Sequence, residues 1–199
     1  MKRLFDWLVR SFRFGTSNSR PAAPVASTHP VSKKPSSEYD NLNNATEGTA
    51  MTFRFSKASL DRLATVDPAL RKVAHRALEL SPIDFVVVQG SRTLDEQKRL
   101  YGKGRTAAQC KAKGVSLEYA RPGEAKVTWT LNSNHIGGKA IDVAPYVDGG
   151  IQWDDSGKRG LWPKIAAAFK QAARELGVPI TWGGDWITNI DRPHFELKR

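Results

Sequence analysis

Residues 133–145, SNHIGGKAIDVAP, join a histidine to an aspartate through a run of small residues. His135 and Asp142 are seven positions apart, and residues with that spacing face opposite sides of an uninterrupted strand. Gly137 and Gly138 lie between them, and glycine adopts backbone conformations that other residues avoid. A sharp turn after His135 therefore allows the two side chains to converge on one point. Taken alone, the pattern favours a simpler interpretation, in which Asp142 caps a turn and His135 packs locally.

A second histidine with a nearby carboxylate lies close to the C-terminus. His194 follows Asp191 by three positions. Two neutral imidazoles and one carboxylate are a common protein ligand set for catalytic zinc, with a fourth position left for water. His75, the other histidine of residues 51–199, lies among basic neighbours and off the apolar stripe of a predicted helix. We interpret it as an exposed surface residue, so the candidate ligand histidines are His135 and His194.

The segments around these residues predict an α+β domain. Apolar residues at helical spacing predict one helix that begins at Asp67-Pro68, one that opens with the capping box of Thr93 and Glu96, and a long one that ends at Gly177. Residues 103–124 predict a long loop with a short helix. The predicted strands are 84–90 (DFVVVQG), 125–131 (AKVTWTL), 139–147 (KAIDVAPYV), 179–184 (PITWGG) and 193–197 (PHFEL), with a hairpin turn at residues 148–150. Such a mixture indicates a small, mainly antiparallel sheet packed with helices.

Composition limits the class of protein. The chain has 199 residues, of which 40% are hydrophobic, and its net charge is +11. This charge predicts attraction to a polyanion, such as nucleic acid, anionic lipid or an acidic envelope polymer. A nucleic-acid partner would rest on charge alone, since the chain lacks an aromatic-basic platform or a recognised motif. The single cysteine, Cys110, excludes an internal disulfide framework, and we interpret it as incidental rather than nucleophilic.

The chain divides near residue 50. Residues 15–50 are rich in Ser, Pro, Asn, Thr and Ala, which is typical of a flexible linker. Before them, residues 1–14 (MKRLFDWLVRSFRF) place apolar side chains on one broad helical face and basic ones on the other. This pattern predicts a basic helix at an anionic membrane or envelope surface. A secretory signal fits poorly, because Asp6 and Arg10 interrupt the apolar stretch. The alternative is an over-long reading frame, with Met51 as the start of the folded part.

Three segments resemble a known family. Five residues reproduce the pattern S-x-H-x-x-G-x-A-x-D of the zinc D-Ala-D-Ala-type carboxypeptidases, family M15 of the peptidases: Ser133, His135, Gly138, Ala140 and Asp142. The C-terminal WGGDWITNIDRPHFEL is similar to the second half of that family's motif, and most similar to the phage L-alanyl-D-glutamate endopeptidases, which are single-domain endolysins. The segment QGSRTLDEQ resembles an upstream motif of the family. The three segments occur in the family's order, and the resemblance covers about residues 85–199.

The resemblance implies a role for each matched residue. It implies zinc held by His135, Asp142 and His194, with Asp191 as general base and Arg92 in support of the oxyanion. Glu196, on the same strand face as His194, is the rival for the base. The remaining candidates are Ser133 as a substrate contact and a cleft wall shaped by Trp182, Asp185 and Trp186.

The resemblance also implies the activity. We expect a monomeric, zinc-dependent peptidoglycan hydrolase that cuts the stem peptide, at the bond between L-Ala and D-Glu. It would be made in the host bacterial cytoplasm, without a clear signal peptide, and act on the cell wall in the periplasm. The alternatives are a D-Ala-D-Ala carboxypeptidase or dipeptidase of the same fold and a non-catalytic zinc-binding module. Retention of Asp191 and Arg92 counts against the module.

Overall fold

The computed structural model describes residues 53–198. The basic helix and linker expected in residues 1–50 lie outside this range and stay predictions. Within it the α+β class is confirmed. Among the described residues, no helix is long and apolar enough to cross a membrane.

An antiparallel sheet forms the centre of the fold. Its order is β1-β2-β5-β4, and the short β3 pairs with β2. The strands are β1 (Phe85–Gln89), β2 (Ala140–Val147), β3 (Gly150–Ile151), β4 (Ile180–Trp182) and β5 (His194–Leu197). Asp148 and Gly149, with φ of 55° and 77°, form the predicted hairpin turn between β2 and β3. Because β2 lies between β1 and β5, its residues are placed at the middle of the sheet.

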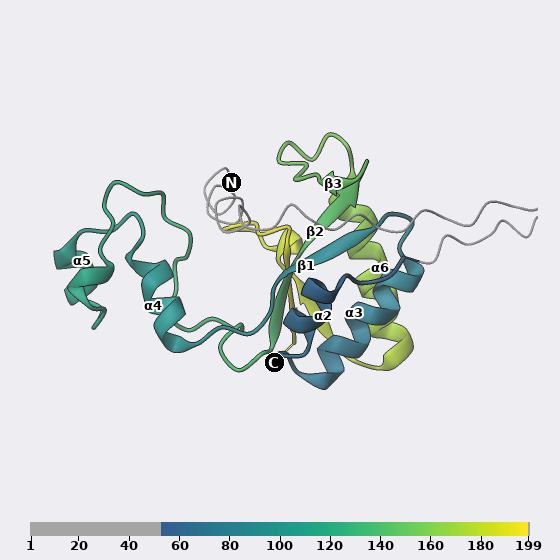
Figure 1. The fold of residues 1–199 in the computed structure, drawn as a ribbon, viewed down its shortest axis with the longest axis horizontal. Helices are drawn as coiled ribbons and strands as arrows, with labels where there is room; N and C mark the ends of the chain where they lie inside the picture. The colour runs from purple at the N-terminus through teal and green to yellow at the C-terminus, as the bar shows by residue number, and fades with distance from the viewer. Residues whose placement is uncertain (1–52, 199) are drawn as a thin grey trace, which may run out of the picture.

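Helices α2 (Lys57–Leu63), α3 (Pro68–Leu80) and α6 (Leu161–Leu176) lie together beside the sheet (Figure 1). The core between them contains Phe85, Ile141, Phe169 and Phe195, all fully buried. The rings of Phe169 on α6 and Phe195 on β5 stack with centroids 4.0 Å apart. Truncation of a buried phenylalanine typically costs about 3–5 kcal/mol. The strand that carries His194 is therefore fixed firmly by its neighbour Phe195.

Helix ends follow the predicted capping residues. The Asp67 side chain accepts a hydrogen bond from Ala69 N at the start of α3, and Thr93 and Glu96 form a reciprocal capping box at α4 (Leu94–Gly102). Helix α6 ends at Gly177, whose φ is 64°. Helix α2 was not expected, because its seven residues carry too few apolar positions to show a period.

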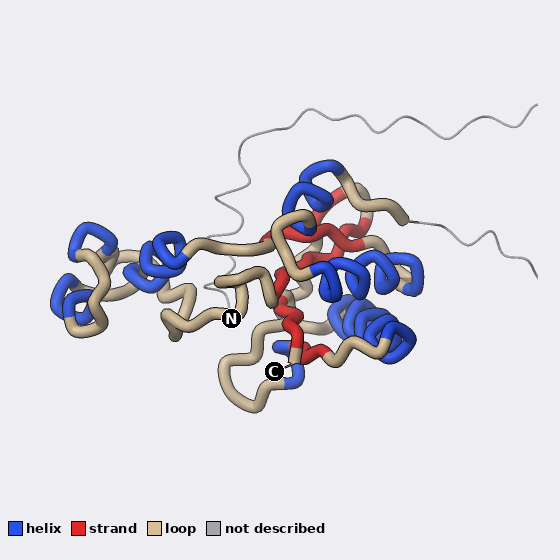
Figure 2. The backbone as a smooth tube through the Cα atoms, turned by 90° about the horizontal axis from the view of Figure 1, so that it is seen from below, coloured by secondary structure: helices blue, strands red, loops and turns tan. Residues whose placement is uncertain are grey.

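Residues 91–132 form an arm that projects from the body of the molecule (Figures 1 and 2). The arm carries α4, α5 (Ala107–Lys111) and the 3₁₀ helix η1 (Leu117–Tyr119). Its own small core contains Tyr101, Cys110 and Val115, so the cysteine is a buried packing residue. The expected long loop with a short helix is thus a packed lobe.

The strand predicted for residues 125–131 is wrong. This segment has strand-forming residues, but no described strand pairs with it. Side chains of the arm bind its backbone instead: Arg105 Nη2 donates to Thr128 O at 2.8 Å, and Gln97 Nε2 donates to Thr130 O at 2.7 Å. β propensity reflects packing on a neighbouring strand, and here the neighbour is missing.

Candidate metal centre

Sheet register and one turn bring the two halves of the site together. Asp142 on β2 lies directly opposite His194 on β5, and directly opposite residues of an antiparallel pair share one face. His135 lies in the turn before β2, where Gly137 and Gly138 have φ of 87° and 72°. A Cβ on Gly138 would lie 2.9 Å from Thr65 O. Glycine is required there both for the backbone conformation and for the close approach to the neighbouring loop.

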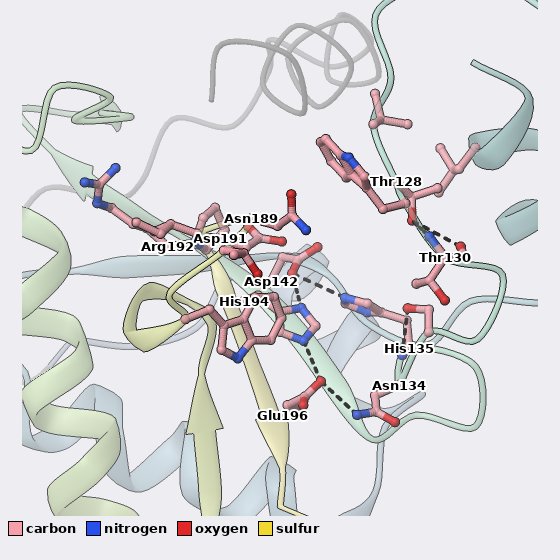
Figure 3. Close-up of a pocket in the computed structure, with 18 of the residues that line it drawn as sticks. Thr128, Thr130, Asn134, His135, Asp142, Asn189, Asp191, Arg192, His194 and Glu196 are labelled. Carbon is pink, nitrogen blue, oxygen red and sulfur yellow. Dashed lines mark hydrogen bonds and ion pairs between the residues drawn. The ribbon is translucent and has the colours of Figure 1, made fainter. Parts of the chain in front are cut away.

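Three ligand atoms converge on one point (Figure 3). One ligand atom from each of His135, Asp142 and His194 lies within 4.8 Å of the others. Asp142 Oδ1 is 3.3 Å from His135 Nε2 and 3.1 Å from His194 Nδ1. All three residues are buried, with exposed fractions of 3%, 5% and 6%. Buried polar groups this close need a shared partner or shared protons.

The outer nitrogen of each imidazole has an acceptor of its own. His135 Nδ1 is 2.8 Å from Gly90 O, and a carbonyl only accepts, so this nitrogen carries the proton. His194 Nε2 is 2.9 Å from Glu196 Oε2, a carboxylate that accepts in the same way. The inner nitrogens, His135 Nε2 and His194 Nδ1, face Asp142. Metal-binding histidines almost always donate their other N–H to such an acceptor, so the arrangement fits a cation held by two nitrogens and one carboxylate oxygen.

The charges and hydrogen bonds of these side chains also favour a bound cation. Burial by itself raises the pKa of Asp142, but the charges and hydrogen bonds of His135 and His194 hold it well below its usual range. Burial lowers the pKa of His194, yet the hydrogen bonds to Asp142 and Glu196 outweigh it and raise the value to about 10. The site therefore favours positive charge at its centre. A divalent cation would take the place of the His194 proton.

Asp191 lies beside the cluster of His135, Asp142 and His194 but is not one of the three candidate ligands. Burial, followed by the negative charge of Asp142, raises the pKa of Asp191 to about 7. Its backbone N–H donates to Gly183 O at 2.9 Å. Its carboxylate accepts no hydrogen bond from any residue between 53 and 198. That carboxylate is therefore open toward the cavity next to the cluster (Figure 3).

Arg92 lies in the same cavity, at the base of the arm. Its backbone N–H donates to His135 O at 3.0 Å, which ties it to the turn that carries the first histidine. Its guanidinium Nη1 donates to Gln97 Oε1 at 2.7 Å. Gln97 is fully buried and also donates to Thr128 Oγ1 and Thr130 O. The buried Gln97 amide thus binds both Arg92 and the arm segment that contains Thr128 and Thr130.

The cavity over the cluster has a volume of about 1200 Å³. His135, Asp142 and His194 line one part of it, residues 127–130 and 132 of the arm another, and residues 186–193 a third. Its apolar lining includes Trp129, 59% exposed, and Ile187, 98% exposed. An open cavity with apolar walls and a few convergent polar groups is typical of a binding site for an extended ligand.

Comparison with known proteins places this geometry in a family. The family model for the phage L-alanyl-D-glutamate peptidase matches residues 51–198. The chain belongs to this family. It is 43% identical to the L-alanyl-D-glutamate peptidase of Escherichia phage T5 over 149 residues, which cover 75% of this chain and 92% of the phage protein.

Two bacterial proteins are similar as well. The peptidoglycan L-alanyl-D-glutamate endopeptidase CwlK of Bacillus subtilis (strain 168) is 38% identical over 121 residues, 58% of this chain and 61% of that protein. The crystal structure of the Serratia marcescens L-Ala D-Glu endopeptidase ChiX superposes with a TM-score of 0.55 at 29% identity, and covers 77% of this chain and 96% of that one. The sequence resemblance to the phage endopeptidases of this family is confirmed.

The structure places most of the candidate residues predicted from the sequence around one cavity. The cavity lining includes Arg92, Ser133, His135, Asp142, Trp186, Asp191, His194 and Glu196. Trp182 and Asp185 are not among the lining residues. The Trp182 ring stacks on Phe195 and its N–H donates to Arg192 O at 2.8 Å. Asp185 pairs with Lys170 at 2.7 Å. Neither side chain therefore forms part of the cavity wall, and the Asp185 carboxylate, 51% exposed, lies in a surface ion pair.

Sequence reasoning missed four groups that contact the site residues or line the cavity: the Gly90 carbonyl, Gln97, Trp129 and Asn134. A backbone carbonyl leaves no trace in a sequence. Trp129 was assigned to a strand, which hid its exposed position in the cavity. Gln97 lies inside the quoted QGSRTLDEQ motif, and Asn134 lies between Ser133 and His135, so their places beside matched residues were the available signal.

Proposed function

We propose that this protein is a zinc-dependent peptidoglycan hydrolase that cuts the stem peptide between L-Ala and D-Glu. The observation that carries the proposal is the buried convergence of His135, Asp142 and His194 on the cavity of a phage L-alanyl-D-glutamate peptidase family member. The relatives named for this activity include the phage T5 peptidase, and the match covers 92% of the length of that protein. The excess positive charge favours attraction to an anionic envelope.

In this proposal His135 Nε2, His194 Nδ1 and a carboxylate oxygen of Asp142 hold the zinc. The ion supplies Lewis acidity, which lowers the pKa of water to about 7 and polarises the scissile carbonyl. Because all three side chains are buried, the site excludes bulk solvent from the ligands. Low local polarity strengthens the electrostatic interactions on which the reaction depends.

Asp191 acts as the general base. Its open carboxylate takes a proton from the attacking water as the oxygen–carbon bond forms. It then returns that proton to the nitrogen of D-Glu as the peptide bond breaks. The guanidinium of Arg92, held by Gln97, donates to the carbonyl oxygen as negative charge develops there. The position of each group at the cavity supports both roles, and neither group needs to bind the zinc.

The substrate lies between the arm and the metal cluster. We assign Ser133, whose hydroxyl accepts a hydrogen bond from His135 N at 3.3 Å, and the exposed wall residue Trp129 to substrate contact. Trp182 shapes the wall indirectly, through its packing on Phe195, and Asp185 is assigned no substrate contact. Residues 51–199 form the catalytic domain in this proposal. Residues 1–14 add contact with an anionic membrane or envelope surface, and the protein acts as a monomer on the cell wall.

Digestion of purified peptidoglycan by the full chain tests the activity. Mass spectrometry of the products should show new free N-termini on glutamate and new C-termini on alanine. Release of free D-alanine or of a D-Ala dipeptide would instead support the carboxypeptidase or dipeptidase alternative. A zinc-loaded protein that produces no new termini would be the non-catalytic module.

A further inference from the structure

One carboxylate oxygen outside the metal cluster receives two hydrogen bonds. Glu196 Oε2 is 2.9 Å from His194 Nε2 and 2.8 Å from Asn134 Nδ2 (Figure 3). The Glu196 side chain is 20% exposed, so solvent competes little for it. Asn134 immediately precedes His135, while Glu196 lies two residues beyond His194 on β5. The pair thus connects the chain segments that carry the two histidines.

The position of Glu196 separates it from the reacting groups. His194 contacts Asp142 through Nδ1 and Glu196 through Nε2. The imidazole ring therefore stands between the two carboxylates. A carboxylate on the far side of a ligand histidine is badly placed to take a proton from water near Asp142. It is well placed to decide which nitrogen of that histidine is protonated.

We propose that Glu196, oriented by Asn134, is the positioning residue of the metal centre. Its carboxylate keeps the His194 proton on Nε2, so that Nδ1 offers its lone pair to the cation. Its negative charge also raises the basicity of the ring. The Asn134 amide holds Glu196 in place and so fixes the turn of His135 relative to β5. The inference rests on the metal centre of the proposed function, but not on which peptide bond is cut.

The two histidines are held by acceptors of different charge. His135 Nδ1 has the neutral Gly90 carbonyl, fixed by the backbone. His194 Nε2 has an ionised side chain, which a second side chain must orient. The His194 contact is the stronger of the two, because hydrogen bonds to ionised acceptors are about twice as strong as neutral ones. It is also the one that a point substitution can remove.

Zinc affinity is the first measurement, made by chelator competition on the full chain. Glu196→Gln should weaken zinc binding about tenfold and Glu196→Ala up to about a hundredfold, as expected for a partner of a ligand histidine. Asn134→Ala should weaken it in the same direction. Glu118→Gln, the same change on the exposed η1, should have no effect. At saturating zinc, Glu196→Gln should retain much of its activity, which a general base would not.

The second measurement determines which nitrogen of the His194 ring carries the proton. Long-range ¹H–¹⁵N NMR of the zinc-loaded wild type should show His194 protonated on Nε2 and metal-bound through Nδ1, and the Nε2–H signal should move in Glu196→Gln. Loss of folding in Glu196→Ala would leave the near-isosteric Gln variant as the test. Unchanged zinc affinity in Glu196→Gln, or a proton on Nδ1, overturns the inference. A wild type that binds zinc but cuts nothing would remove the proposed activity and leave this inference standing, whereas one without zinc affinity overturns both.

Discussion

At the scale of single residues, the proposed mechanism assigns metal binding and proton transfer to different side chains. Asp191 and Glu196 are both carboxylates close to His194, and the sequence resemblance assigned the base to Asp191 with Glu196 as its rival. Glu196 is engaged by His194 and Asn134, while Asp191 is open toward the cavity. The difference depends on which way each side chain points from its backbone. Residue spacing does not carry that information, whereas the three-dimensional arrangement supports the proposal that Asp191 is the base.

The Asp191→Asn substitution should test this division. The amide keeps the size of the side chain but cannot accept the proton, and loss of a general base typically costs about 10²- to 10⁴-fold in rate. The variant should be folded and fully loaded with zinc, yet nearly inactive on peptidoglycan. Metal analysis and a peptidoglycan turbidity assay measure the two properties. If Asp191→Asn remains active at saturating zinc and Glu196→Gln is inactive, the base is Glu196.

At the scale of elements, the sequence predicted those whose local signals agree with their packing. The capping residues of α3 and α4, the hairpin after β2 and the end of α6 all follow residue chemistry within a few positions. Residues 125–131 show the limit of this approach, because strand propensity has no effect without a neighbouring strand. The three clustered residues, His135, Asp142 and His194, could be found from the sequence because the family motifs contain them. The arm's contact with Arg92 could not, as it depends on one buried side chain.

Gln97→Ala should therefore uncouple the arm from the site. It removes the acceptor of Arg92 Nη1 and the donor to Thr130 O. Unsatisfied buried groups cost about 1–3 kcal/mol in the free energy of unfolding. A displaced guanidinium should lower kcat by up to about a hundredfold, whereas zinc content should not change. Gln171→Ala, on the exposed face of α6, is the matched control. Unchanged kcat in Gln97→Ala would show that Arg92 holds its position without the amide.

At the scale of the whole molecule, most of the net positive charge lies in residues 51–199. Residues 1–50 carry seven of the 31 Lys and Arg and four of the 20 Asp and Glu. The arm, residues 91–132, carries nine basic residues against four acidic ones. A chain that starts at Met51 should therefore keep its activity on isolated peptidoglycan. If residues 1–14 form a basic surface helix, this chain should lose binding to anionic vesicles, measured by co-sedimentation. Equal vesicle binding by both chains would favour the over-long reading frame.

The last prediction concerns the response of the protein to pH with and without zinc. In the metal-free protein the pKa of His194 is raised to about 10, above its unfolded value of about 6.5. The stability that this group contributes is fully present below about pH 6.5 and is lost as pH rises through 10. Asp191, with a pKa raised to about 7, acts in the same direction between about pH 4 and 7. The metal-free protein should thus become less stable from pH 7 toward 10.

Zinc should reverse this trend, because it competes with the proton on His194. Each zinc bound near neutral pH displaces about one proton, so apparent zinc affinity should rise about tenfold per pH unit between pH 6.5 and 8.5. Ligand binding to the folded state alone raises its stability, so the increase in Tm on zinc addition should grow over the same interval. Differential scanning fluorimetry with and without zinc, at matched ionic strength, measures it. A zinc-dependent increase in Tm that stays constant with pH would mean that His194 carries no proton for the metal to displace.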